Sequence, residues 1–177
     1  MADAAQTKRN RFLKGEITLD EALDMTPTQL AALFHTGHAL VEQGRLAEAR
    51  LIFEGLAVLD SGNAMVHAML GVIFHKLGRP AAAVGEYNQA QALLPGDIQS
   101  LVNRGEIFLK HGLLERAAAD LRLAVSRDPD CHHPAANRAR LLLGLLKEAV
   151  ETAEQRGLDA VTEAKKRFDL QLGNLRG

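Results

Sequence analysis

The sequence predicts an all-α protein: a right-handed α-solenoid of three helix-turn-helix repeats, with helical segments before and after them. The first observation behind this prediction is a set of glycine pairs that recur at a step of 34 residues, which is the length of one helix-turn-helix unit. The pairs are Gly37 and Gly44, Gly71 and Gly78, and Gly105 and Gly112. With 15 glycines in 177 residues, such regular spacing is a poor match to chance.

The second observation is that other residue types keep the same 34-residue step. An alanine column and two columns of large residues recur with the glycines: Ala49, Ala83 and Ala117; Leu40, Phe74 and Phe108; Phe53, Tyr87 and Leu121. Two helices approach closely only where side chains are small, and large side chains fill the space beside the crossing. We therefore expect these columns to form the core of each repeat.

The third observation is that helix start and stop signals fall in the same frame. Thr26, Pro27 and Gln29 make a helix start in which Thr26 caps and Gln29 completes a reciprocal capping pair. The predicted repeats are 27–60, 61–95 and 96–129, and the turn glycines divide each of them into two helices. The expected helices are 27–42 and 46–59, then 64–76 and 80–93, then a helix from the Asp97 cap to 110 and a last one over 114–127.

The flanks depart from the repeat. Residues 1–10 are polar without periodicity, which predicts a disordered N-terminus, and 11–26 form an N-terminal helical segment with a short helix from about 19 to 25. Beyond residue 129, the glycine columns fall on Ala139 and Leu146. Residues 130–177 are therefore predicted as C-terminal capping helices and a tail, with a helix over 134–154 and another over 158–172.

The amino-acid composition argues against some classes of function. The 47% hydrophobic content allows a substantial core, whereas a net charge of −1, one Tyr and no Trp provide neither a basic field nor stacking platforms for nucleic acid. No apolar stretch has the length of a membrane span or of a signal peptide, so we expect no membrane insertion and a cytoplasmic protein. The single cysteine, Cys131, fits a reducing compartment.

The sequence contains no recognisable catalytic or metal-binding motif. His132 and His133 are adjacent and point to different sides of a helix, and no Cys or carboxylate stands at ligand spacing from them. His35 and His38 share a helix face without an accompanying catalytic motif. We expect no enzyme activity, no metal and no cofactor.

Three segments carry a family resemblance: GHALVEQGRLAEARLIFEGLAVLD, GVIFHKLGRPAAAVGEYNQAQALLP and GEIFLKHGLLERAAADLRLAVSRDP. They resemble tetratricopeptide repeats. With the N-terminal RFLKGEITLDEALDMTPTQLAALF and the helical C-terminus, the chain is also similar to the class II chaperones of type III secretion. That resemblance implies a homodimer that holds an extended segment of a hydrophobic translocator in a concave groove.

In tetratricopeptide geometry, the groove is lined by one face of the first helix of each repeat. The candidate groove residues are mostly apolar, and a patch of this kind is expected to be covered by a partner. They are Ala31, Phe34, His38, Val41, Met65, Ala68, Val72, His75, Gln99, Val102, Glu106 and Leu109. Phe34 is the expected hot spot. The alternative is that neighbouring helices or the C-terminal helix cover some of these residues.

The main alternative function is a general tetratricopeptide scaffold or adaptor for another protein partner. One class of scaffold grips a C-terminal carboxylate with Lys, Asn and Arg side chains. The equivalent positions in this chain are Phe34, His38, Met69, Gln99 and Asn103. Because charged donors are missing from these positions, carboxylate capture is not expected, while other scaffold roles stay open.

Overall fold

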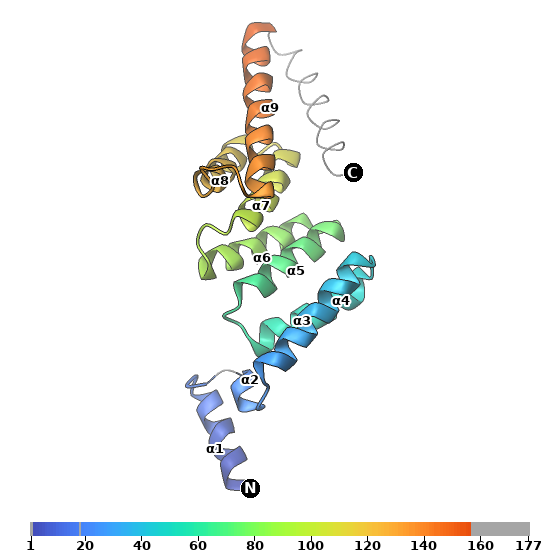
Figure 1. Cartoon of the computed structure of the whole chain (residues 1–177), viewed down its shortest axis with the longest axis vertical. Helices are drawn as coiled ribbons and strands as arrows, with labels where there is room; N and C mark the ends of the chain where they lie inside the picture. The colour runs from blue at the N-terminus through green and yellow to red at the C-terminus, as the bar shows by residue number, and fades with distance from the viewer. Residues whose placement is uncertain (1, 18, 157–177) are drawn as a thin grey trace. The chain divides into compact units, whose positions relative to one another are not determined.

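The computed structural model of the chain describes residues 2–17 and 19–156, and all regular structure within them is helical. The chain divides into two compact units, Met1–Pro95 and Gly96–Gly177. Figure 1 shows the helices of each unit along the chain. The first unit holds α1 (Ala2–Leu13), α2 (Leu19–Ala22), α3 (Pro27–Glu42), α4 (Leu46–Leu59), α5 (Ala64–Lys76) and α6 (Pro80–Leu93), and the second holds α7 (Ile98–Lys110), α8 (Leu114–Ser126) and α9 (Pro134–Arg156).

The first unit contains two helix-turn-helix repeats, α3–α4 and α5–α6. At the start of α3, the backbone amide of Gln29 donates to Oγ1 of Thr26 at 3.3 Å, and the backbone amide of Thr26 donates to Oε1 of Gln29 at 2.8 Å. Gly44 and Gly78 make the turns inside the repeats at φ of +75° and +71°, a left-handed conformation that glycine adopts without strain. The predicted bounds of all four helices are confirmed.

The glycine and large-residue columns meet inside each repeat. A Cβ atom built on Gly37 would lie 2.7 Å from Cε2 of Phe53, and one on Gly105 would lie 3.1 Å from Cγ of Leu121. Both large residues are fully buried. The columns predicted to form the core therefore do so, and a side chain in the glycine column has no room.

The second unit contains the third repeat, α7–α8, and the long helix α9. Asp97 caps α7 by accepting from the backbone amide of Ser100 at 2.8 Å. The start of α9 is held by the buried carboxylate of Asp128, which accepts from the amide of His132 at 3.0 Å and from Nη1 of Arg140 at 3.1 Å. Helix α9 extends two residues beyond the predicted end at 154, and the helix predicted over 158–172 lies outside the described residues.

One acidic position that contacts the preceding helix of its repeat also keeps the 34-residue step. Glu86 on α6 and Asp120 on α8 are equivalent positions, and each pairs with a basic side chain on the preceding helix. Nδ1 of His67 lies 2.8 Å from Oε2 of Glu86, and Nε of Arg104 lies 2.7 Å from Oδ2 of Asp120. The second repeat therefore pairs this carboxylate with a histidine, and the third pairs it with an arginine.

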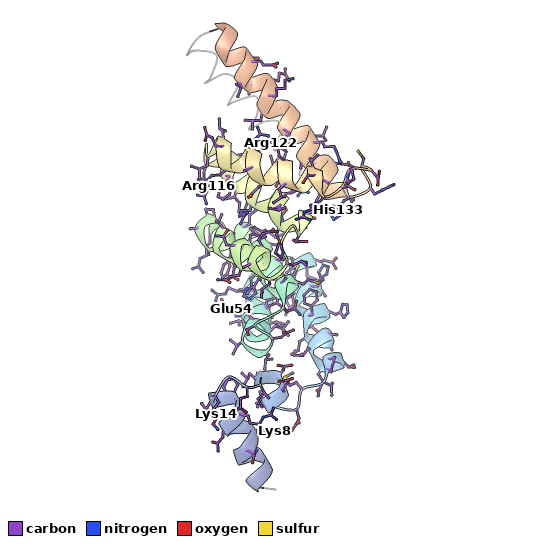
Figure 2. All side chains as sticks on the ribbon, turned by 90° about the vertical axis from the view of Figure 1, so that its left-hand side faces the viewer. Lys8, Lys14, Glu54, Arg116, Arg122 and His133 are labelled. Carbon is purple, nitrogen blue, oxygen red and sulfur yellow. The ribbon has the colours of Figure 1, made fainter. Side chains whose placement is uncertain are left out.

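The prediction of disorder over residues 1–10 is wrong, because α1 begins at Ala2. Alanines at positions 2, 4 and 5 raise the intrinsic helix propensity of a segment that has no apolar periodicity. Lys8 on α1 pairs with Asp24, just after α2, and Figure 2 shows Lys8 and Lys14 on this N-terminal part of the first unit. Helix α2 ends at Ala22 rather than near residue 25, since Asp24 takes a left-handed φ of 56°.

Candidate protein-binding surface

The candidate groove residues lie on the first helix of each repeat. Eight of them are on α3 and α5 in the first unit, and four are on α7 in the second. In each helix their spacing of three or four residues places them on one face. The solvent exposure of these faces differs between the two units.

On α3, the candidate residues are partly open. Ala31 and His38 are exposed, and His38 Nδ1 lies 3.7 Å from Oε1 of Glu42, one turn further along the same helix. Phe34 is half-buried because its ring packs edge-on against Phe53, with ring centroids 5.2 Å apart and an interplanar angle of 88°. Phe34 is therefore a support of the repeat core as well as a surface residue.

On α5, the candidate residues form the most accessible apolar surface of the predicted set. Met65 is 62% exposed, and Ala68, Val72 and His75 are half-buried. Helix α3 has one formally charged residue, Glu42 at its end, and α5 also has one, Lys76 at its end. The bodies of both helices are thus uncharged apart from histidines.

In the second unit, the predicted open groove is only partly present. Gln99 is exposed, but Val102, Glu106 and Leu109 are buried. Helix α9 packs against α7, and Nε of Arg138 lies 2.6 Å from Oε1 of Glu106. Val102, Glu106 and Leu109 are therefore not open in this structure, as the alternative interpretation expected for some of the candidate positions.

A polar chain continues across this part of α7. Arg138 also donates to Oδ1 of Asn103 at 3.1 Å, and the Asn103 oxygen accepts from the Gln99 amide at 2.8 Å. The sequence did not single out Arg138, since its partners lie more than 30 residues away and outside the repeat frame. Val41 on α3 is the remaining buried position of the twelve. The binding role of the twelve residues stays a prediction.

Other apolar side chains are exposed away from the predicted surface. Leu51 and Val58 lie two turns apart on α4 and are 63% and 65% exposed. The sequence frame gives them no core role, and neither belongs to a groove position. Leu51 matches Met65 in exposure, which makes it a useful control residue.

Two other kinds of site are absent from the described residues. No group of three or more His, Cys, Asp and Glu side chains in this part of the chain is arranged to hold a metal ion. Among the same residues, no helix is long and apolar enough to cross a membrane.

The paired helices, turn glycines and core columns define a helical-repeat protein of the α-solenoid class. Tetratricopeptide-repeat profiles match residues 2–64 and 98–131, together more than half of the chain. The chain therefore belongs to the tetratricopeptide-repeat family, whose fold serves as a protein-binding scaffold. A curated relative, tetratricopeptide repeat protein 14 of Mus musculus, is 35% identical over 60 residues, which are 34% of this chain and 8% of the relative's length.

The first profile begins well before the predicted first repeat. Leu19, Ala22 and Pro27 stand one 34-residue step before Phe53, Leu56 and Ser61, so α1 and α2 fall in the place of a preceding repeat. Helix α2 has four residues, however, where α4 and α6 have 14 each. The glycine columns fall on Asp3 and Asn10 in this segment, so the glycine pairs did not reveal this unit in the sequence.

Solved structures of similar fold include secretion chaperones. The type III secretion translocator chaperone SycD of Yersinia enterocolitica is 20% identical, with 72% of this chain and 97% of that chain covered and a TM-score of 0.66. A type III secretion complex from Aeromonas hydrophila is 25% identical, covering 80% and 96%, with a TM-score of 0.71. PcrH bound to the chaperone-binding region of PopB is 23% identical, covering 66% and 95%, with a TM-score of 0.62. These likenesses establish the fold.

Proposed function

We propose that this protein is a cytoplasmic chaperone of type III secretion that holds a segment of a hydrophobic translocator before export. The observation that carries the proposal is the uncharged surface of α3 and α5, with Met65 as its most exposed apolar side chain. Such a surface is costly to leave in water and suits an apolar client. The proposal includes self-association into a homodimer and no catalytic step.

Further support comes from the kind of protein that shares this fold. SycD is described as a translocator chaperone, and PcrH is bound to a chaperone-binding region. In both cases the fold covers nearly the whole of that chain, at 97% and 95%. A similar role for this chain would need a client surface, and α3 and α5 offer one.

Co-expression with the hydrophobic secreted proteins encoded beside this gene tests the proposal. We expect one of them to co-purify with the full chain and to be lost with Met65→Glu. Met65 is the second residue of α5, where an added carboxylate is favourable to the helix N-terminus, so the variant should fold.

Leu51→Glu is the matched control, because Leu51 is equally exposed on a helix outside the candidate surface. It should retain the client. If no hydrophobic secreted protein co-purifies with the wild-type chain, a general scaffold role replaces the chaperone role. If Leu51→Glu loses the client and Met65→Glu keeps it, the binding surface is on the other side of the repeat.

A further inference from the structure

We infer that Gln99 and Asn103 of α7 form hydrogen bonds with the backbone of a bound extended segment, and that Arg138 of α9 positions them for this. The inference rests on the proposed function and adds a polar contact in the second unit. Gln99 stands one 34-residue step after Met65, so the third repeat has an amide side chain where the second has an exposed apolar one.

Arg138 determines which atom of the Asn103 amide faces it. A guanidinium group has N–H donors and no acceptor, so the Asn103 atom that lies 3.1 Å from Nη2 of Arg138 is the oxygen. The ion pair with Glu106, at 2.6 Å from Nε of Arg138, holds the guanidinium in this place. The NH2 group of Asn103 is therefore left to donate to another partner.

The orientation of the Gln99 amide follows from that of Asn103. Because the Asn103 oxygen is an acceptor, Gln99 turns its nitrogen toward this oxygen, at 2.8 Å. Oε1 of Gln99 is then left as an acceptor. Within the described residues, neither Oε1 of Gln99 nor Nδ2 of Asn103 has a hydrogen-bond partner. Gln99 is exposed and Asn103 is half-buried, so a ligand can reach this pair.

One oriented donor and one oriented acceptor match the polar groups of an extended backbone, whose C=O and N–H groups are unpaired within the segment. Positions 99 and 103 are about 6 Å apart along the helix axis. Two residues of an extended chain span a similar length, at about 3.3 Å each. Because Glu106 balances the charge of Arg138, the cluster suits a neutral amide rather than a client carboxylate.

A displayed library of random peptides, selected on the full chain, provides the probe. The tightest binder is synthesised again with one backbone amide at a time replaced by an ester, which removes an N–H and weakens the adjoining C=O. Fluorescence polarisation measures each peptide on the wild type, Gln99→Ala, Asn103→Ala and Arg138→Met, at a temperature where all variants are folded. Arg140→Met is the matched control, since Arg140 lies on the same helix and pairs with Asp128 at 3.1 Å.

In the wild type, we expect an ester at one or two positions to weaken binding about three- to tenfold. Gln99→Ala and Asn103→Ala should abolish this ester penalty. Arg138→Met should reduce it although both amides remain, because the Asn103 amide can then turn. Arg140→Met should leave the penalty unchanged. Equal reductions in Arg138→Met and Arg140→Met would mean that Arg138 has a structural role only.

An ester penalty that is the same in all variants would overturn the inference. If Met65→Glu still weakens binding of the probe in that case, the proposed function stands. Replacing each Asn or Gln side chain of the probe by Ala is the second arm, and sensitivity to Asn103→Ala confined to one such side chain would overturn the backbone contact. If the full chain selects no peptide from the library, the inference and the proposed function both fail.

Discussion

Gly71 of α5 faces the ring of Tyr87 of α6 so closely that a Cβ atom at position 71 would lie 2.5 Å from Cε1 of that ring. Tyr87 is fully buried and is the largest side chain of the first unit's core. Helices α5 and α6 can therefore approach this closely only because residue 71 has no side chain. The same pairing of a glycine with a large residue recurs at Gly37 and Phe53.

The contact predicts that Gly71→Ala destabilises the protein, although alanine is the better helix former. The added methyl must displace a ring that has no free space, so we expect a loss of about 1–3 kcal/mol in the free energy of unfolding. Urea denaturation followed by circular dichroism measures it.

Gly85→Ala is the matched control. Gly85 lies inside α6 with nothing within 4 Å of a built Cβ atom. Alanine there should stabilise the protein by about 0.5–1 kcal/mol, since only helix propensity changes. Equal effects of the two substitutions would contradict the close crossing at Gly71.

The repeats could be predicted because their determinants are local or periodic. Gly44 and Gly78 mark turns that need a left-handed backbone, and the columns of Ala49 and Phe53 return at a fixed step, so the bounds of α3 to α6 can be read from the sequence. The N-terminal helix α1 could not be predicted in this way. Its alanines favour a helix without an apolar pattern, and no glycine stands at the two glycine columns of this segment, Asp3 and Asn10.

The candidate surface could be predicted only in part, for a different reason. The positions on α3, α5 and α7 are equivalent in sequence, but their exposure depends on the helices that pack on each repeat. Arg138 on α9 lies outside the repeat frame and meets Glu106 across more than 30 residues. No spacing rule connects these two residues, so the ion pair that covers Glu106 could be found only in the three-dimensional structure.

The ion pair between Arg138 and Glu106 predicts a non-additive pair of substitutions. The Glu106 side chain is 8% exposed and that of Arg138 is 34% exposed, so removal of the cation leaves a carboxylate in a poorly hydrated place. We expect Arg138→Met to lower the free energy of unfolding by about 1–3 kcal/mol. A buried charge costs more without its partner than an apolar pair does.

The double variant Arg138→Met with Glu106→Leu should therefore be more stable than Arg138→Met alone. Urea melts of the wild type, both single variants and the double variant give the coupling energy. Additive losses would mean that the 2.6 Å contact contributes nothing to the docking of α9 on α7.

The carboxylate of Asp128 predicts a pH dependence of stability. Burial would raise the pKa of Asp128, but the hydrogen bond from Arg140, the amides of His133 and His132, and the charge of Arg140 together hold this pKa below its ordinary value. A lowered pKa in the folded state means that Asp128 stabilises the fold above its unfolded pKa of about 3.9. This contribution is lost as the pH falls through the folded value.

Thermal melts of the wild type and Asp128→Asn between pH 3 and 7 measure this effect. The difference in Tm should be full and constant at about pH 5–7 and should shrink below about pH 4, as the wild-type carboxylate takes up its proton. Asp130→Asn is the control, since Asp130 is an exposed neighbour in the same loop. A difference in Tm that stays constant down to pH 3 would contradict the lowered pKa.

Substitution of Phe34 is expected to have two separable effects, one on stability and one on client binding. Its edge-on contact with Phe53 supports the core, and its half-buried ring belongs to the candidate surface. Phe34→Ala should lower the free energy of unfolding by about 1–3 kcal/mol, less than for a fully buried ring. It should also weaken client binding by about 1–2 kcal/mol. Met65→Ala, at a more exposed site, should affect binding while leaving stability within about 0.5 kcal/mol.

Calorimetry with the co-purified client, at a temperature where all variants are folded, separates the two effects. If Phe34→Ala lowers stability while its affinity equals that of the wild type, Phe34 is a core residue alone, and the client surface lies along α5. If Met65→Ala also leaves the affinity unchanged, the surface of α3 and α5 does not bind the client. Loss of affinity in both variants makes the two helices one site, because their only shared change is the loss of apolar area on this face.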